Sequence, residues 1–549
     1  MTGYMETVVI GIDGGEWDII EPLIDEGSLP NLSDLVETGV YGDLKSITPP
    51  VSPPAWTSIQ TGVNPGKHGI YDFSKFDEHY QRHSLNASER KSSPFWKVMN
   101  DSRVTTGLFK IPFTYPPNDV DGFLVTGFPT PNSVQDYTVP QNLTAEVKDP
   151  SELFENEDYL HEGDYKGYKH NLVRVANRQS EQLIKLVKEN DTDFLMTVYV
   201  GSDRIQHFYW KYFDESHPRY KHDADFSSAF KEYYQAVDDG IGELLDEAGK
   251  DTNVVVLSDH GFGKLSHDIY IDEWLDQEGF LSRVPETDPK EAGRRGVAIV
   301  LKKSWEIVEG AGLNHHIRAM LPESLFSKGA DIQPDLKSGI EWEGTEAFFS
   351  TLSGQAIFIN LEDRFTDGVV SWDGYDDIVE RLQSSLLNLK HPETGDNLVV
   401  DVVRTDDEFY GWALEEAPDL IVETAPEYTL KGGRSDSLIE PSKQHQNDRS
   451  GDHRSKGILV ANGPDFTSGK ISDASVLDIA PTLLYLCRCP IPESMDGEIL
   501  MDLFNAEATD ARTVEKTDEY GRTDGEVQQW TQEEETELKE QLSSMGYLE

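Results

Sequence analysis

Short runs of apolar, β-branched residues alternate with longer amphipathic segments over most of this chain. Runs such as VVIGI, before Asp13, show no polar alternation, which is typical of strands buried on both faces of a parallel sheet. Between the runs, apolar residues recur at helical spacing. The pattern predicts an α/β domain whose helices cover a largely parallel sheet. The predicted strands lie in residues 6–13, 103–112, 122–128, 193–202, 253–261 and 456–464, and the helices in residues 16–39, 171–189 and 227–249.

The pattern changes in residues 265–425. Helical segments come first, and short strands follow near residues 346–351, 355–361, 397–405 and 419–424, with a helix near residues 375–389. This order predicts a smaller α+β subdomain inserted into a core formed by residues 1–264 and 426–505. The polar residues 431–457 are predicted to be a long loop that leads back to a core strand. Residues 506–549 form an acidic tail that ends in a helix.

The charge excludes some classes of partner. The 549 residues include 101 acidic and 48 basic residues, for a formal net charge of -53. Apolar and aromatic residues persist along the chain, so we expect a folded protein with an acidic surface. Such a surface repels nucleic-acid polymers and anionic membranes. Acidic excess with few lysines also resembles the surfaces of proteins from salt-loving organisms, and we expect a halophilic protein.

No segment reaches the length of a membrane-spanning helix, and the N-terminus lacks the basic and apolar pattern of a secretion signal. We therefore expect a soluble, cytoplasmic protein, while the oligomeric state stays open. Cys487 and Cys489 follow an apolar helix. Zinc would need further ligands nearby, so this pair is interpreted as two half-buried thiols.

Candidate chemistry lies at the ends of predicted strands. Asp13 ends the first strand, and Asp259 and His260 end a later one; glycine follows in both places. Open α/β sheets bind ligands at the carboxyl ends of their strands. Taken alone, each carboxylate is also a common turn residue before glycine. Asp13 and Asp259 are therefore either turn residues or ligands at the end of the sheet.

Two further motifs add nitrogen and oxygen ligands. Asp203 and His207 share one face of a helix that begins near Ser202, where they can hold a metal or bond to each other. His453 precedes the last predicted core strand. It is either a metal ligand or a histidine that is solvated or hydrogen-bonded to a neighbouring residue. Together with the strand ends, this mixture suits two divalent cations, Zn²⁺ in the first place and Mn²⁺ as an alternative.

Ser52 can act as a helix cap or as a nucleophile. The stretch SPPAWTSIQT predicts a helix with Ser52 at the N-cap and Pro53 at the first helical position. A serine at a helix N-terminus also faces unpaired N–H groups, and a nearby dication would lower the pKa of its hydroxyl. Thr57 and Ser58 lie further into the helix, where packing or a bond to an earlier carbonyl is expected.

As an ordered set, these motifs resemble the type I phosphodiesterase/nucleotide pyrophosphatase family of the alkaline phosphatase superfamily. The resemblance rests on GIDGG, SPPAWTSIQTGVNPGKHGI, DRIQH, SDHG and GDHRSKG, and it extends to the SVLDIAPTLLYL helix and MDGEIL. It implies a three-layer alkaline-phosphatase-like core and places the nucleophile at Ser52 rather than Thr57. It implies one metal held by Asp203, His207 and His453, and a second held by Asp13, Asp259, His260 and the oxygen of Ser52.

The chain departs from the family at one substrate-binding position. Nucleotide pyrophosphatases carry an asparagine shortly after the His-Gly-Ile run that helps to bind the transferred phosphoryl group, whereas this chain has Phe73. Phe73 and Lys110 are therefore the candidate substrate-binding residues. Arg434 and Lys443 are alternative sources of positive charge, and solvated surface is the alternative role of each basic residue.

Other residues bear on the substrate class. Trp56, Tyr115 and Trp210 could stack on a base or sugar, although core packing is the alternative for each. Trp56 stands where sulfatases that form formylglycine need arginine, which disfavours that activity. The resemblance implies hydrolysis of phosphodiester or nucleotide pyrophosphate bonds in a small-molecule substrate through a phosphoryl-serine intermediate. A phosphomonoesterase, a phosphoryl or phosphoalcohol transferase and a non-catalytic metal-bound module are the alternatives.

Overall fold

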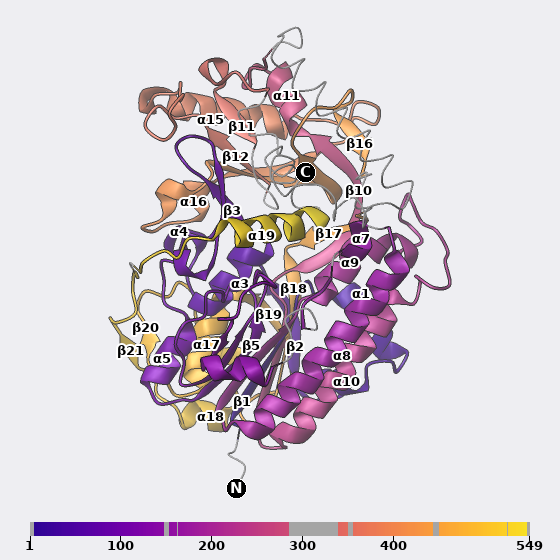
Figure 1. The fold of residues 1–549 in the computed structure, drawn as a ribbon, viewed down its shortest axis with the longest axis vertical. Helices are drawn as coiled ribbons and strands as arrows, with labels where there is room; N and C mark the ends of the chain where they lie inside the picture. Colours follow the sequence, from indigo (N-terminus) through magenta and orange to yellow (C-terminus); the bar gives the residue numbers. More distant parts are fainter. Residues whose placement is uncertain are drawn as a thin grey trace, which may run out of the picture.

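A large sheet forms the centre of the computed structural model (Figure 1). Its nine strands run in the order β19-β2-β18-β9-β1-β8-β5-β6-β7 among the described residues. The structure describes residues 5–147, 153–156, 158–161, 163–284, 339–349, 355–442, 449–523 and 525–545. Residues 285–338 of the predicted insertion and Lys443 lie outside the described residues.

The central sheet is largely parallel, as predicted. Strand β18 is antiparallel to β9 and β2, and β7 is antiparallel to β6, whereas the other neighbours pair in parallel. The six predicted core strands are confirmed, and β2, β7 and β19 are additional. The strands are β1 (Thr7–Ile12), β2 (Val40–Lys45), β5 (Thr106–Ile111), β6 (Gly122–Thr126), β7 (Thr138–Val139), β8 (Phe194–Tyr199), β9 (Asn253–Leu257), β18 (Lys456–Asn462) and β19 (Gly469–Ser475).

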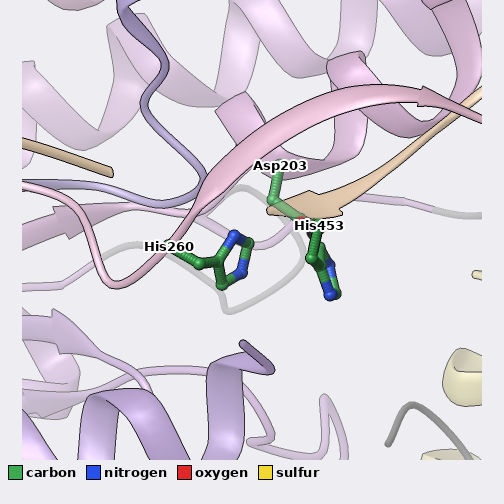
Figure 2. Close-up of side chains that lie close together, drawn as sticks. All are labelled: Asp203, His260 and His453. Carbon is green, nitrogen blue, oxygen red and sulfur yellow. Dashed lines mark hydrogen bonds and ion pairs between the residues drawn. The ribbon is translucent and has the colours of Figure 1, made fainter. Parts of the chain in front are cut away.

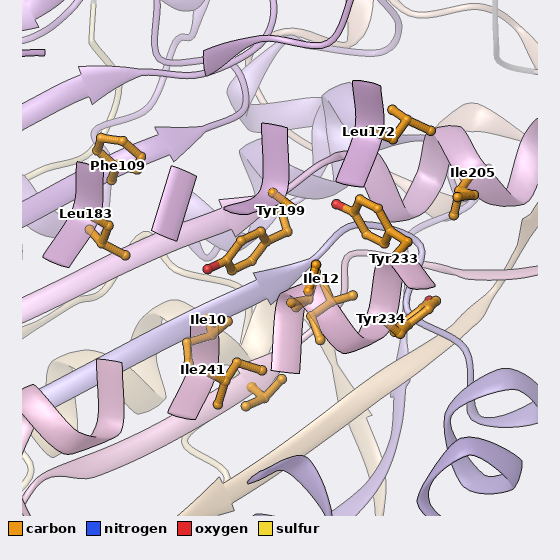
Figure 3. Close-up of a cluster of buried hydrophobic side chains, with 14 of the residues drawn as sticks. Ile10, Ile12, Phe109, Leu172, Leu183, Tyr199, Ile205, Tyr233, Tyr234 and Ile241 are labelled. Atoms are coloured by element: carbon orange, nitrogen blue, oxygen red, sulfur yellow. The ribbon is translucent and has the colours of Figure 1, made fainter. Parts of the chain in front are cut away.

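Helices cover both faces of this sheet and create two apolar layers. On one face α8 and α10 lie side by side, and their side chains pack on Ile10 and Ile12 of β1 (Figure 3). On the other face Val9 of β1 packs with apolar residues of α3, α5 and α17. One face holds α1 (Trp17–Asp25), α2 (Pro30–Thr38), α8 (Tyr165–Glu189), α9 (Gly201–Phe213) and α10 (Ala229–Ala248), and the other holds α3 (Ser52–Thr61), α5 (Phe95–Asp101) and α17 (Ile479–Leu486).

Between β9 and β18, the residues that the structure describes build smaller sheets above the core (Figure 1). One sheet has the order β11-β12-β14-β13 and packs with α15 on its own apolar cluster. The other contains β10, β15 and β16, with β17 paired to β10. The elements are β10 (Gly261–Tyr270), α11 (Ile271–Gln277), β11 (Ala347–Phe349), β12 (Ala356–Ile359), α15 (Trp372–Leu387), β13 (Val399–Arg404), α16 (Thr405–Glu408), β14 (Leu420–Thr424), β15 (Glu427–Lys431), β16 (Ile439–Pro441) and β17 (Gly451–Arg454).

The prediction of one long loop over residues 431–457 is wrong, because β16 and β17 lie within it. Strand β16 has only three residues, and β17 consists of four residues without an apolar side chain, so neither shows the apolar pattern that identifies a strand. Strand β17 is antiparallel to β10, and its His453 lies opposite Phe262. This pairing brings the chain that leaves β9 beside the chain that enters β18.

The C-terminal segment crosses the core and ends in the predicted terminal helix, α19 (Gln532–Ser544). Leu538, Leu542 and Met545 are buried in an apolar cluster that includes Phe73 and Phe113. The remaining short elements are α4 (Pro65–His68), β3 (Ser74–Phe76), β4 (Arg82–Ser84), α7 (Asp158–His161), β20 (Ile491–Pro492), α18 (Ala506–Asp510) and β21 (Lys516–Thr517), with 3-10 turns η1 (Ala87–Glu89), η2 (Gln141–Ala145), η3 (Trp342–Gly344), η4 (Leu414–Glu416), η5 (Val476–Asp478) and η6 (Met501–Leu503).

None of the helices in the described residues combines the length and apolar character needed to cross a bilayer. Both cysteines are free thiols; Cys489 is buried and Cys487 is half-buried. Burial raises the pKa of both thiols, so they are poor metal ligands in this environment.

The side chains of Trp56 and Val198 pack closely against the backbone at Gly11, in the middle of β1. A Cβ atom at this position would lie 2.6 Å from Cη2 of Trp56 and 2.8 Å from Cγ2 of Val198. Both neighbours are fully buried, so Gly11→Ala should lower the free energy of unfolding by about 1–3 kcal/mol through overpacking. Urea denaturation measures this change.

Gly374→Ala in the first turn of α15 is the matched control. A Cβ atom there would meet only Ser371 Oγ, at 3.8 Å. Because alanine favours a helix over glycine by up to about 1 kcal/mol, this change should be neutral or stabilising. Equal stability of the two variants would show that the space around Gly11 is not limiting.

Candidate active site

Several of the candidate side chains lie at the carboxyl ends of three neighbouring strands, at one edge of the central sheet. Strand β1 lies between β8 and β9, and the three strands are parallel. Asp13 follows β1, Asp259 and His260 follow β9, and Asp203 lies in the first turn of α9 directly after β8. Because parallel strands end at the same edge, residues far apart in sequence meet there.

His453 reaches the same place from a different sheet. It lies on β17 opposite Phe262, which is two residues beyond His260. Figure 2 shows Asp203, His260 and His453 converging from separate elements. Their candidate ligand atoms lie within 4.8 Å of one another.

The first group of ligand atoms surrounds the ring nitrogen Nε2 of His260. This atom lies 3.6 Å from Asp13 Oδ1, 3.4 Å from Asp259 Oδ2 and 3.1 Å from Ser52 Oγ. Ser52 Oγ also lies 3.5 Å from Asp13 Oδ1. The hydroxyl therefore lies within the group of carboxylates and imidazole.

The prediction that Ser52 is an N-cap is wrong by one residue. Helix α3 begins at Ser52, and Val51 occupies the N-cap position with extended dihedral angles. Pro53 consequently takes the second helical position, where its missing N–H group still breaks no helical hydrogen bond. Thr57 Oγ1 donates to the carbonyl of Pro53 at 2.7 Å, as expected, whereas Ser58 Oγ pairs with His68 Nε2 at 3.0 Å.

The second group of ligand atoms surrounds Asp203. Its Oδ1 lies 3.2 Å from His207 Nε2 and 3.1 Å from His453 Nε2. Asp203 and His207 are four residues apart on α9, so they share the face that points at β17. The spacing that the sequence suggested as a metal pair therefore brings both side chains to His453.

Backbone carbonyls orient two of the three imidazoles. Nδ1 of His207 lies 2.9 Å from the carbonyl of Gly451, and Nδ1 of His260 lies 3.0 Å from that of Gly261. Nδ1 of His207 also lies 2.8 Å from the donor Nη2 of Arg449, so the carbonyl contact does not by itself fix the tautomer of that ring. For His260, a carbonyl oxygen only accepts, so its Nδ1 carries the proton and its Nε2 directs a lone pair toward the carboxylates. This is the tautomer in which Nε2 binds a metal ion.

Burial fixes the charge state of the same imidazoles. It lowers the pKa of His207, His260 and His453 to about 4, because a charged ring would lose its hydration. The rings are neutral at pH 7. Burial also raises the pKa of Asp13 and Asp259.

The arrangement fits divalent cations. The unprotonated Nε2 of His260 and the carboxylate oxygens around it are all acceptors, so their close approach is stabilised by a positive charge between them. Asp259 Oδ2 is buried without a hydrogen-bond partner among the described residues. Carboxylate, imidazole and hydroxyl ligands suit Zn²⁺ and Mn²⁺.

Several residues that sequence reasoning missed support these ligands. The Trp56 indole donates to Asp13 Oδ2 at 2.8 Å, and Gln206 Nε2 donates to the Gly14 carbonyl at 2.7 Å. Asp452 groups with His207 and His453 as a further candidate ligand set. No sequence signal identifies these contacts, because each joins distant elements. Trp56, singled out for its ring, acts through its N–H group.

Arg449 adds a positive charge beside His207. Its Nη2 lies 3.1 Å from His207 Nε2 and 3.0 Å from Asp452 Oδ1. This charge contributes, after burial, to the lowered pKa of His207. A cation thus approaches the nitrogen that faces Asp203.

A small cavity lies beside Ser52. It measures about 10 Å³, which is close to the space that one water molecule needs. Phe73 lines it, as do Phe113 and Phe128, and the buried residues of α19 pack on Phe73 and Phe113. The cavity lining comprises Asp13, Ser52, Pro53, Phe73, Pro112, Phe113, Phe128, Val200 and Arg204.

The predicted basic residues lie elsewhere. Lys110 is fully buried, where its Nζ donates to the carbonyl of Leu153 and lies 3.7 Å from Glu155. Arg434 donates to the carbonyl of Val284 at 3.4 Å. Neither lines the cavity beside Ser52.

The other predicted aromatic residues serve in packing. Tyr115 stacks on Trp530 with ring centroids 5.5 Å apart, and Trp210 stacks on Phe262 at 5.9 Å. Both are buried.

Comparison with solved structures gives similar folds at low sequence identity. Human ectonucleotide pyrophosphatase/phosphodiesterase 5 is 13% identical with a TM-score of 0.48, and the match covers 91% of this chain and 100% of the human one. The murine protein in an inactive form with AMP is 12% identical with a TM-score of 0.48, and the match covers 88% and 95%. The comparison with curated protein sequences gives no significant match.

A model of the family described as type I phosphodiesterase / nucleotide pyrophosphatase matches residues 7–456. The matched range includes every candidate ligand from Asp13 to His453. The chain therefore belongs to the type I phosphodiesterase / nucleotide pyrophosphatase family, and it is a phosphohydrolase.

Proposed function

We propose that this protein hydrolyses phosphodiester or nucleotide pyrophosphate bonds of small molecules, with Ser52 as the nucleophile and two divalent cations as cofactors. The observation that carries the proposal is the position of Ser52 Oγ, 3.1 Å from His260 Nε2 and 3.5 Å from Asp13 Oδ1. The hydroxyl oxygen therefore lies among the groups that would hold one of the cations, where an attacking oxygen is required. The family match supports the reaction class.

The ligand groups divide between the two cations. Asp13, Asp259, His260 and Ser52 would hold one cation, and Asp203, His207 and His453 would hold the other. When bound, the cations supply positive charge that lowers the pKa of the serine hydroxyl and stabilises the leaving oxygen. Zn²⁺ is the proposed ion, with Mn²⁺ as the alternative.

The chain then carries out two displacements. Ser52 Oγ gives its proton to solvent water and forms a bond to phosphorus, while the bond from phosphorus to the leaving oxygen breaks and that oxygen takes a proton from solvent. A water molecule then loses a proton to solvent and bonds to phosphorus, while the Oγ–P bond breaks and Oγ takes up a proton to restore the hydroxyl. Trp56 keeps Asp13 in position by donating to its second oxygen.

Ser52→Ala should abolish turnover. We expect kcat for bis-p-nitrophenyl phosphate to fall by at least roughly 10³-fold, because the attacking oxygen is lost. Thr57→Ala is the control, because Thr57 bonds within its own helix. The assay uses Zn²⁺-loaded protein in high salt, as its acidic composition suggests. Equal activity of both variants would exclude Ser52 as the nucleophile.

Metal removal should also stop the reaction. Dialysis against a chelator should reduce hydrolysis to background, and added Zn²⁺ or Mn²⁺ should restore it, because the buried carboxylates need positive charge. Metal analysis of the restored protein should give two ions per chain. Full activity in protein shown to be metal-free would contradict the two-cation site.

Trp56→Phe should weaken metal binding by roughly 10- to 100-fold, because it removes the hydrogen bond that orients Asp13. Competition with a fluorescent chelator measures the affinity for Zn²⁺. Trp96→Phe is a matched control, since Trp96 is also buried but its Nε1 has no hydrogen-bond partner in the described part of the chain. Equal affinities of the two variants would show that the indole bond does not support the site.

A further inference from the structure

The cavity beside Ser52 is too small for the proposed substrate. It measures about 10 Å³, whereas pockets that enclose small-molecule ligands measure roughly 300–1,000 Å³. A phosphodiester carries two organic groups on the phosphorus that Ser52 attacks, and both need room. Part of the wall around this cavity therefore has to move before a substrate can bind there.

Three aromatic rings connect the cavity with the C-terminal helix α19. The rings that line the cavity are Phe73, Phe113 and Phe128. They pack in one apolar cluster with Leu538 and Leu542 of α19 and with Met545, which follows it. These three side chains are at most 1% exposed, although they come from the surface of the core. The apolar face of α19 thus covers the wall of the cavity.

Outside this cluster, a few contacts at its edge hold α19 on the core. Residues 525–529, which lead to the helix, are exposed. Trp530 stacks on Tyr115 with ring centroids 5.5 Å apart, and Glu537 accepts a hydrogen bond from Ser133 Oγ at 2.8 Å. Figure 1 shows α19 at the end of the core that faces the smaller sheets. An exposed connection allows the helix to leave this position without moving the sheet.

The helix depends on docking for its own stability. It has 13 residues, five of them glutamate and one of them lysine. Isolated helices shorter than roughly 12–15 residues are marginal in water, and most helical stability in proteins comes from packing of an apolar face. Release of α19 from the aromatic rings should therefore also unfold it. Segments of low local stability are the ones that open and close over binding sites.

We propose that residues 525–545 form an autoinhibitory segment: docked α19 keeps the cavity beside Ser52 closed, and substrate enters when α19 leaves the core. The inference rests on the proposed function of Ser52 and adds control of access to it. When only the undocked form binds substrate, the apparent affinity is reduced in proportion to the undocked fraction. A change that weakens docking without altering the site consequently raises activity.

The first test weakens docking in the full-length, metal-loaded protein. Leu538→Ala combined with Leu542→Ala should raise kcat/KM for bis-p-nitrophenyl phosphate by at least roughly 10-fold, because the loss of two buried side chains increases the undocked fraction. Glu537→Ala should give a smaller rise, since it removes only the bond to Ser133 at the edge. Unchanged or lower kcat/KM in the folded double variant would overturn the proposal.

Helix α15 offers a matched control. Leu382 and Leu386 have the same spacing and are fully buried, but they belong to the apolar cluster of the smaller sheets. Leu382→Ala combined with Leu386→Ala should leave kcat/KM unchanged. Hydrogen exchange of the central sheet verifies that each variant is folded. An equal rise of kcat/KM in this control would show that general loosening is the cause, and it would overturn the proposal.

A second test measures access without catalysis. In metal-loaded Ser52→Cys protein, a bulky maleimide should label position 52 at least roughly 10-fold faster when Leu538 and Leu542 are alanine, as followed by mass spectrometry of the peptide that contains it. The α15 control should not change this rate. Equal labelling rates with and without the two α19 substitutions would overturn the proposal.

The proposed function can fail independently. Failure of the wild-type protein and of the α19 variant to hydrolyse phosphate esters would refute the proposed function, but the labelling rates would still measure access to position 52. Faster labelling after the α19 substitutions would then still support an autoinhibitory segment over the site.

Discussion

The burial of Asp13, Asp203 and Asp259 beside neutral imidazoles is the constraint on which the site depends. Removing ionised carboxylates from water costs several kcal/mol each unless positive charge compensates them. The central sheet nevertheless brings them to one edge, because β1, β8 and β9 are adjacent and parallel. A fold selected for stability alone would not place three acidic groups there. The arrangement is understandable when cations are part of the working protein.

Much of this edge could be predicted from local sequence. The apolar runs identify the parallel strands, and the residue that follows a buried strand identifies Asp13 and Asp259. Helical spacing pairs Asp203 with His207. These inferences locate the side chains at this edge because each relies on a few neighbouring residues and on the common behaviour of strand ends. The family resemblance added the roles of the same side chains and the choice of Ser52.

Other features depend on contacts that local sequence does not contain. The bond from Trp56 to Asp13 joins α3 to the end of β1, and the position of Arg204 beside Ser52 depends on the path of α9. Strand β17 was missed because a polar strand of four residues lacks apolar alternation. Lys110 was singled out for its charge, yet the fold turns it toward Leu153. The halophilic character, the cytoplasmic location and the identity of the metal stay predictions.

The pairing of β10 with β17 has a consequence for how this molecule can diversify. The chain leaves the core just after His260 and returns just before β18, and the two crossings pair as antiparallel strands with Phe262 opposite His453. This pairing holds the two ends of the intervening segment together, and described residues of the segment also contact the core, as Ala413 does by accepting a hydrogen bond from Tyr71 Oη. Lengthening a segment whose ends are already joined adds little entropic cost. Residues can therefore be inserted into this segment over evolution while His260 and His453 keep their spacing.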